Sequence, residues 1–147
     1  SMPGKANVYG FPANSFKQSA VDACSFVEGV TKVLARGAFY VMGDLLQIFG
    51  SQPKLRTDIG RLQGKTATPI YRGEFSDWLV KLPVRYNANA MSPEQIINLF
   101  NVAGFSIGVG QWRPEKNGNM GMFHVANPDE IKDFSQKYHI SERKIKD

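Results

Sequence analysis

Apolar residues in the first part of the chain recur every three or four positions, and this period predicts a helix. From Asn14 onward these positions share one face of the helix. The face consists of Phe16, Ala20, Ala23, Cys24, Val27 and Val30. Asn14 or Ser15 can cap the start, and Gly37 is expected to stop the helix after Arg36.

Alternation with a period of two follows and predicts strands. Residues 38–49, AFYVMGDLLQIF, are predicted to form two short strands joined by Gly43-Asp44, because glycine in the first turn position suits a type II′ hairpin. Residues 69–86 predict a longer strand in which Pro83 indicates an edge or a bulge. One face of that strand carries Trp78, Val80, Leu82, Val84 and Tyr86.

Two later helices have clear start signals. For residues 92–104, Ser92 is the N-cap, Pro93 is the first helical residue and Gln95 completes a capping box. The expected buried stripe is Ile96, Leu99, Phe100 and Ala103, with Gly104 ending the helix. Residues 127–138 repeat this pattern with Asn127, Pro128 and Glu130, and that helix is expected to dock through Ile131, Phe134 and Tyr138.

The remaining segments have weaker patterns. Residues 1–13 resemble a loop, and residues 50–68 are predicted to be a long connection without secondary structure. Residues 105–110 and 120–125 are expected to be strands on either side of a glycine-rich loop. Residues 139–147 are charged and are expected to fray.

This order of elements predicts an α+β protein that is close to a ferredoxin-like βαββαβ unit, with two helices on one face of an antiparallel sheet and an added C-terminal helix. Such a unit needs a strand before the first helix, and residues 1–13 offer only NVYGF. Either that strand is very short, or it is missing because the chain begins partway into a longer protein. The expected division is an N-terminal segment 1–13, in which Ser1 resembles a tag remnant, a domain 9–126 and a tail 127–147.

Composition limits the classes of function. A length of 147 residues with 42% hydrophobic and 21% charged residues is typical of one globular domain. No apolar run reaches the roughly 20 residues of a membrane span, and no signal peptide is visible, so we expect a cytoplasmic protein, in a host cell if it is phage-encoded, with no membrane partner. The single cysteine excludes an internal disulfide and a cysteine-based zinc site.

The net charge of +5 is unevenly distributed. Residues 127–147 contain five acidic and five basic residues, so the excess lies in residues 1–126, which contain 13 basic and 8 acidic residues. This distribution favours a polyanionic partner.

Catalytic patterns are scarce. His124 lies in a strand pattern, where a hydrogen-bonded structural role is expected, and His139 lies in the charged tail. No spacing forces two carboxylates together, and no known phosphate-loop, nucleophile or zinc motif is present. We therefore expect no catalytic residues, metal site or cofactor, with a nuclease activity as the least favoured alternative.

The glycine-rich stretch is the first binding candidate. Gly108 and Gly110 leave backbone N–H groups accessible to an anion. Arg113 and Lys116 add charge, and Trp112 offers a ring on which a base can stack. The alternative is a simple glycine-rich hairpin whose tryptophan packs inward.

The first helix and the basic connection provide two more candidates. Ser15 and Lys17 lie in the first helical turn, where backbone N–H groups and the helix dipole favour an anion, so a lysine there makes sense beside a phosphate. The basic residues that could follow a nucleic-acid backbone are Lys54, Arg56, Arg61 and Lys65, extended by Arg72, Lys81 and Arg85. The alternatives are a solvated lysine and a solvated surface loop.

Two segments together resemble a known group of proteins. FPANSFKQSAVDA, residues 11–23, is similar to the segment that opens the first helix of the RAMP superfamily, the RNA-binding backbone subunits of CRISPR effector complexes. Residues 103–125 resemble the glycine-rich loop of that superfamily and the endings of uncharacterised phage proteins, which share Ala-Gly, Gly-x-Gly, Trp-Arg-Pro, Gly and Phe-x-Val. Gln18 departs from the glycine expected after the lysine, and the dense G-x-G-x-G ending is absent.

This resemblance implies a ferredoxin-like fold that binds single-stranded RNA or DNA with little sequence preference. Lys17, Arg113 and Lys116 would hold phosphates, Trp112 would stack a base, and the basic connection would extend the contact. By analogy, copies of the chain could form a homo-oligomer or a filament. The alternative is a non-catalytic protein-interaction module, such as a phage protein that engages a host or replication factor.

Overall fold

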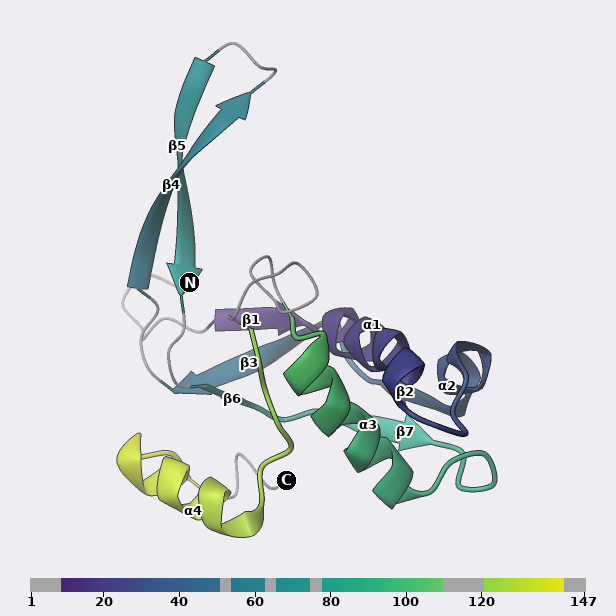
Figure 1. Ribbon diagram of the computed structural model, residues 1–147. Helices are drawn as coiled ribbons and strands as arrows, with labels where there is room; N and C mark the ends of the chain where they lie inside the picture. Colours follow the sequence, from purple (N-terminus) through teal and green to yellow (C-terminus); the bar gives the residue numbers. More distant parts are fainter. Residues whose placement is uncertain (1–8, 51–53, 63–65, 75–77, 110–120, 142–147) are drawn as a thin grey trace.

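The computed structural model describes residues 9–50, 54–62, 66–74, 78–109 and 121–141, and it confirms a mixed α+β architecture with small antiparallel sheets (Figure 1). The strands are β1 (Tyr9–Pro12), β2 (Phe39–Val41), β3 (Leu45–Gly50), β4 (Lys54–Leu62), β5 (Thr66–Glu74), β6 (Trp78–Val80) and β7 (Val84–Tyr86). The helices are α1 (Ala13–Ala23), α2 (Lys32–Ala38), α3 (Pro93–Ser106) and α4 (Pro128–Lys137), with a 3-10 turn at Cys24–Phe26.

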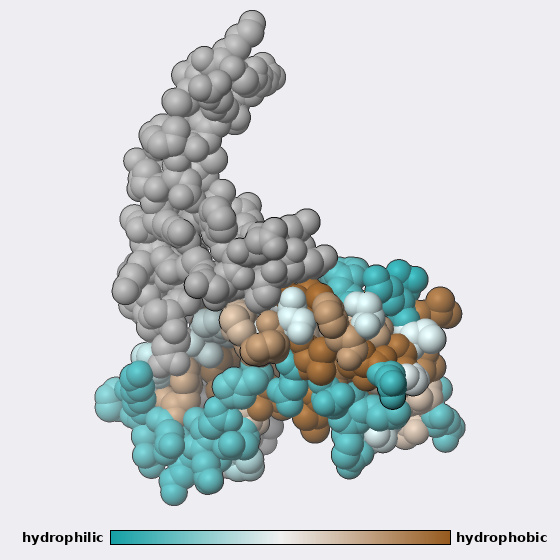
Figure 2. All heavy atoms as spheres, viewed as in Figure 1, coloured by the Kyte–Doolittle hydropathy of each residue, from teal (hydrophilic) through white to brown (hydrophobic). Residues whose placement is uncertain are grey.

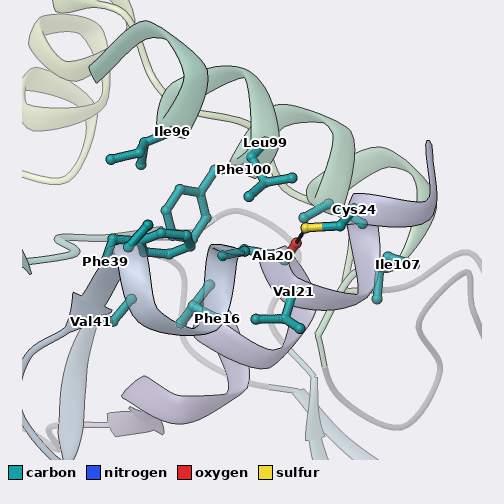
Figure 3. Close-up of a cluster of buried hydrophobic side chains, with 14 of the residues drawn as sticks. Phe16, Ala20, Val21, Cys24, Phe39, Val41, Ile96, Leu99, Phe100 and Ile107 are labelled. Carbon is teal, nitrogen blue, oxygen red and sulfur yellow. Dashed lines mark hydrogen bonds between the residues drawn. The ribbon is translucent and has the colours of Figure 1, made fainter. Parts of the chain in front are cut away.

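Helices α1 and α3 pack against each other on one face of the strands, and the core lies at their interface (Figures 1 and 3). Phe16, Phe39 and Leu99 are among its fully buried side chains. The predicted stripe of α3 is confirmed, because Ile96, Leu99, Phe100 and Ala103 are all buried. Hydrophobic residues also gather on the visible surface over α1 and α3, whereas hydrophilic residues cover the visible side of α4 (Figure 2).

The first predicted helix is interrupted. It starts at Ala13 with Pro12 as the N-cap, so the predicted caps Asn14 and Ser15 were wrong. It ends at Ala23, and Gly29 then takes a φ of 77°, a backbone conformation that suits glycine and breaks the helix. A separate helix α2 begins after its cap Thr31 and runs through Gly37, which does not stop it.

The predicted hairpin at Gly43-Asp44 was wrong, because β2 and β3 do not pair with each other. β2 pairs with β7 and β3 pairs with β6, so both run antiparallel to the same later part of the chain. The Met42 N–H donates to the Pro83 carbonyl across the break between these pairings, at 2.8 Å. The single strand predicted for residues 69–86 is therefore three strands, and Pro83 lies in the break that it was expected to mark.

The ferredoxin-like arrangement is not confirmed. A short strand β1 does precede α1, as one of the two sequence interpretations required. A βαββαβ unit, however, has a strand after its second helix. Within the described residues no strand follows α3, and the strands form separate small sheets, β1-β3-β6, β2-β7 and β4-β5.

The predicted loop 50–68 is largely strand. Residues 54–62 form β4, which pairs with β5 over nine residues on each strand and forms a two-stranded sheet of its own. This hairpin projects away from the helices and from β1, β3 and β6 (Figure 1). In the sequence, Leu55, Thr57 and Ile59 alternate with polar residues, which is the period of a strand, but the charges obscured this pattern.

Candidate functional site

Five of the predicted binding residues lie outside the described residues: Lys65, Gly110, Trp112, Arg113 and Lys116. The other nine fall on four separate parts of the fold, namely the β4–β5 hairpin, the first turn of α1, the β6–β7 strands and the end of α3. The structure therefore does not gather these nine described residues into one site.

The β4–β5 hairpin brings basic residues together. Its register places Arg56 directly opposite Arg72 and Lys54 opposite Glu74. Since residues two apart share a face of a strand, Lys54, Arg56 and Arg72 belong to one face of the hairpin, and Arg61 to the other. Residues 54–74 contain five basic and two acidic residues, a net charge of +3 out of the +5 of the whole chain.

The two-stranded architecture of this hairpin has an energetic consequence. A hairpin of two strands is marginally stable in water unless another surface packs on it. Like charges directly opposite each other on neighbouring strands are destabilising, and Arg56 and Arg72 form such a pair.

The glycines around residue 108 have structural roles. Gly108 is buried with a φ of 73°, and its N–H donates to the Ala103 carbonyl at 2.7 Å, which closes the end of α3. This N–H is therefore already used, contrary to the predicted role of Gly108 as a free anion donor. The predicted strand 105–110 was also wrong, because Phe105 and Ser106 belong to α3.

Residues 121–125 cross the end of α3 rather than forming the expected strand. A Cβ on Gly104 would lie 1.7 Å from the Phe123 carbonyl oxygen, so only glycine permits this crossing. The Phe123 N–H donates to the Gly104 carbonyl, and the Val109 N–H donates to the Gly121 carbonyl at 3.0 Å. These bonds hold Gly121 against Val109 and Phe123 against Gly104 of α3.

Lys17 has partners within the protein. Its ammonium donates to the carbonyls of Ala35, at 2.7 Å, and of Phe39, and it lies 3.7 Å from the centroid of the Phe39 ring. Burial lowers the pKa of Lys17. These contacts explain a lysine at this position without a phosphate, since the positive charge lies at the C-terminal end of α2.

The N-terminus of α1 is also partly occupied. The Ala13 N–H donates to the Asp44 carbonyl at 2.9 Å, and Ser15 is half-buried. Its first turn contains no acidic residue.

Lys81 and Arg85 do not lie on one continuous strand. The break between β6 and β7 separates them, and Lys81 is half-buried while Arg85 is exposed. Arg85 lies directly opposite Tyr40, whose side chain is 54% exposed. The sequence reasoning missed Tyr40, although it lies between the apolar residues Phe39 and Val41 at the position that alternation turns outward.

An apolar groove of about 810 Å³ lies between α3, α4 and the β6–β7 strands. Its lining includes Val80, Leu82, Ile97, Phe123, Ile131 and Phe134. Of the residues expected to dock α4, Ile131, Phe134 and Tyr138 are only half-buried, and Ser135 is the buried residue of this helix.

The capping boxes of α3 and α4 are confirmed. In α4 the Glu130 carboxylate accepts from the Asn127 N–H at 3.1 Å and lies 2.5 Å from Nε2 of His124. The hydrogen bond to Asn127, followed by the contact with His124, lowers the pKa of Glu130. His124 thus has the hydrogen-bonded role expected of it, although residues 121–125 are not a strand.

Within the described ranges, no group of three or more histidine, cysteine or acidic side chains is placed to hold a metal ion. In the same ranges, no helix is both long enough and apolar enough to cross a membrane. Comparison with protein-family models finds no match, and neither a curated protein nor a solved structure is significantly similar to the chain.

Proposed function

We propose that this protein binds single-stranded RNA or DNA with little sequence preference, and that the β4–β5 hairpin makes the main phosphate contacts. The proposal rests mainly on the register of the β4–β5 hairpin, which places Arg56 opposite Arg72. This hairpin projects away from the helices and from β1, β3 and β6 (Figure 1). Residues 54–74 hold more than half of the net positive charge, and phosphate contacts supply most sequence-independent affinity for nucleic acids.

The RAMP-like resemblance and a ferredoxin-like relationship belong to this proposal. Two helices on one face of antiparallel strands support the relationship, whereas the division of the described strands into separate small sheets does not. Arg113 and Lys116, between Val109 and Gly121 in the sequence, remain predicted phosphate contacts.

A salt titration tests the proposal. Fluorescence anisotropy with a labelled mixed-sequence single strand should give a dissociation constant that rises steeply with salt, with a slope of about 0.7 per phosphate contact on a logarithmic scale. Arg56→Gln with Arg72→Gln should weaken binding at low salt and reduce that slope by about 1.4. Lys32→Gln with Lys132→Gln removes the same charge from exposed helical positions and should leave both values nearly unchanged.

Three results would contradict the proposal: no binding at low salt, an affinity independent of salt, or equal losses in the hairpin variant and its charge-matched control. A separate variant, Arg113→Ala with Lys116→Ala, measures the contribution of the glycine-rich segment.

A protein-interaction module is the second candidate, and the apolar groove beside α4 favours it. Ile97 and Met122 line this groove and remain 47% and 41% exposed. Under this alternative, Ile97→Glu should abolish binding of a protein partner, while Arg56→Gln with Arg72→Gln should leave it intact. The two candidate functions therefore predict opposite effects of the same pair of variants.

A further inference from the structure

The outward face of the β2–β7 strand pair carries an aromatic ring beside an arginine, and we propose that Tyr40 and Arg85 form a base-stacking site for the nucleic acid. In this site an unpaired base lies against the Tyr40 ring and Arg85 contacts the adjoining phosphate. The inference rests on the proposed function and adds to it the residues that select single strands over duplexes.

The burial pattern establishes which way Tyr40 faces. Phe39 and Val41 are buried, so Tyr40 between them lies on the exposed face of β2. Arg85 is directly opposite Tyr40 in the antiparallel register and therefore shares its face. Both side chains are exposed, and Tyr40 keeps 54% of its surface accessible.

The neighbouring sheet β1-β3-β6 has outward positions of its own. Trp78 and Val80 pack against the core, and the half-buried Leu79 between them, which also lines the apolar groove, lies opposite Phe49. Gln47, on the same face of β3 as Phe49, is exposed, and its neighbour Leu46 is buried. Within the described strands β2, β3, β6 and β7, the outward positions contain no acidic residue.

The chemistry of this face suits unpaired bases. A tyrosine ring provides a flat surface on which any base can stack, and stacking is tolerant of sequence. Arginine holds phosphate oxygens with a planar set of donors and remains charged at every physiological pH. The Lys17 ammonium lies 5.1 Å from the Tyr40 ring centroid and adds positive charge beside the ring.

The sequence connects the strands beside the stacking site to the basic hairpin. β3 leads into β4 through residues 51–53, and β5 leads into β6 through residues 75–77. Along the chain, Arg85 therefore follows the hairpin that carries Arg56 and Arg72. The positive charge of Arg85 and Lys17, with no acidic residue on the described strands β2, β3, β6 and β7, favours a nucleic acid over a protein as the occupant.

Tyr86 provides a matched control. It lies on the neighbouring strand, opposite the fully buried Phe39, and so belongs to the face that carries the helices. Its side chain is 43% exposed, close to the value for Tyr40, and it lines the apolar groove. Tyr40→Leu and Tyr86→Leu therefore remove the same ring, at similar exposure, from opposite faces of one strand pair.

Anisotropy with a single strand and with the duplex of the same sequence tests the site. Tyr40→Leu should weaken single-strand binding by roughly 5- to 150-fold, the effect of losing one stacked base, and should change duplex binding by less than about twofold. Tyr40→Phe should bind like the wild type, and Arg85→Gln should weaken single-strand binding in the same direction as Tyr40→Leu. Tyr86→Leu should have no effect on either affinity.

Photo-crosslinking gives a second readout that does not depend on a variant. A single strand containing 5-bromouracil should form an adduct that fragment masses locate at Tyr40. Adducts confined to other residues would overturn the inference, as would equal losses in Tyr40→Leu and Tyr86→Leu or equal losses of single-strand and duplex affinity. If the wild type binds and the hairpin variant weakens binding while Tyr40→Leu does not, the stacking site fails and the proposed function stands. If the wild type binds no oligonucleotide, both fail.

Discussion

Replacing Gly104 with alanine should destabilise this protein, although the same change stabilises most helices. Gly104 lies inside α3, where glycine is about 1 kcal/mol less favourable than alanine. A Cβ at this position would lie 1.7 Å from the Phe123 carbonyl oxygen and 2.5 Å from the carbonyl carbon. Backbone atoms cannot yield as a flexible side chain does, so residues 122–125 would have to move away from the helix.

The cost of that movement follows from the contacts of Phe123. Its N–H donates to the Gly104 carbonyl at 3.1 Å, and such a bond contributes about 1 kcal/mol. The centroid of its half-buried ring lies 5.5 Å from the ring centroid of Phe16 and 6.4 Å from that of Trp78. Removing the ring from this aromatic cluster costs about 2–3 kcal/mol. After subtracting the gain in helix propensity, Gly104→Ala should destabilise the fold by about 2–3 kcal/mol.

Gly37→Ala is the matched control. Gly37 is an exposed residue of helix α2, and a Cβ there would meet nothing within 4 Å. This variant should gain about 0.5–1 kcal/mol from helix propensity alone. In thermal unfolding followed by circular dichroism, Gly104→Ala should lower the midpoint temperature by about 8–12 °C, and Gly37→Ala should raise it slightly. A Gly104→Ala protein as stable as the wild type would refute the crossing of residues 121–125 over α3.

Three further predictions concern buried and capping groups. Lys17→Met keeps the apolar stem but removes the donor to the Ala35 and Phe39 carbonyls, so the free energy of unfolding measured in urea should fall by about 1–3 kcal/mol. Lys32→Met, at an exposed site, should leave that free energy unchanged. A Lys17→Met protein that is as stable as the wild type but has lost nucleic-acid binding would instead support a phosphate contact. Ser19 is 3% exposed and its hydroxyl has no hydrogen-bond partner within the described residues. Ser19→Ala should therefore raise the free energy of unfolding in urea by about 1 kcal/mol. A lower free energy of unfolding would show that the hydroxyl has a partner. The pKa of Glu130 is lowered in the folded state, so the stability that its ionised form contributes is present above the usual carboxyl pKa and is lost as the pH falls through the lowered pKa. In an NMR titration, the chemical shift of the Asn127 amide should therefore change at a pH below the usual carboxyl range. This change should be absent in Glu130→Gln.

Local signals predicted the helices with capping boxes, because these signals act within one turn. Ser92 with Gln95 and Asn127 with Glu130 each satisfy two backbone donors that no distant residue affects. The outward position of Tyr40 could also have been found, since it needs only the alternation Phe39, Tyr40, Val41.

The incorrect predictions from the sequence, namely the end of α3 and the pairing of the strands, involve contacts between segments that are far apart in the chain. Gly104 suggested a helix end, but its partner Phe123 is 19 residues later, and no local pattern reveals that approach. The buried stripe in fact continues through Ala103 to Ile107 at helical spacing, so the helix signal was present and was outweighed by the glycines. The predicted pairing of β2 with β3 was wrong for the same reason, because β2 pairs with β7 and β3 pairs with β6.

The structural roles of these glycines change where nucleic-acid contacts should be sought. A glycine that closes a helix end or lies under a crossing backbone has no N–H left for a phosphate, as the hydrogen bond of Gly108 shows. The charge that favours a polyanion must then act through side chains, and in the described residues the basic side chains concentrate on β4 and β5. Under the proposed function, a nucleic acid packs on this two-stranded hairpin, which is marginally stable alone, and stacks a base on the exposed Tyr40 ring beside Arg85. Binding and ordering of the hairpin should therefore be one event, so amide exchange in β4 and β5 should slow when a single strand binds, while exchange in α3 should not change.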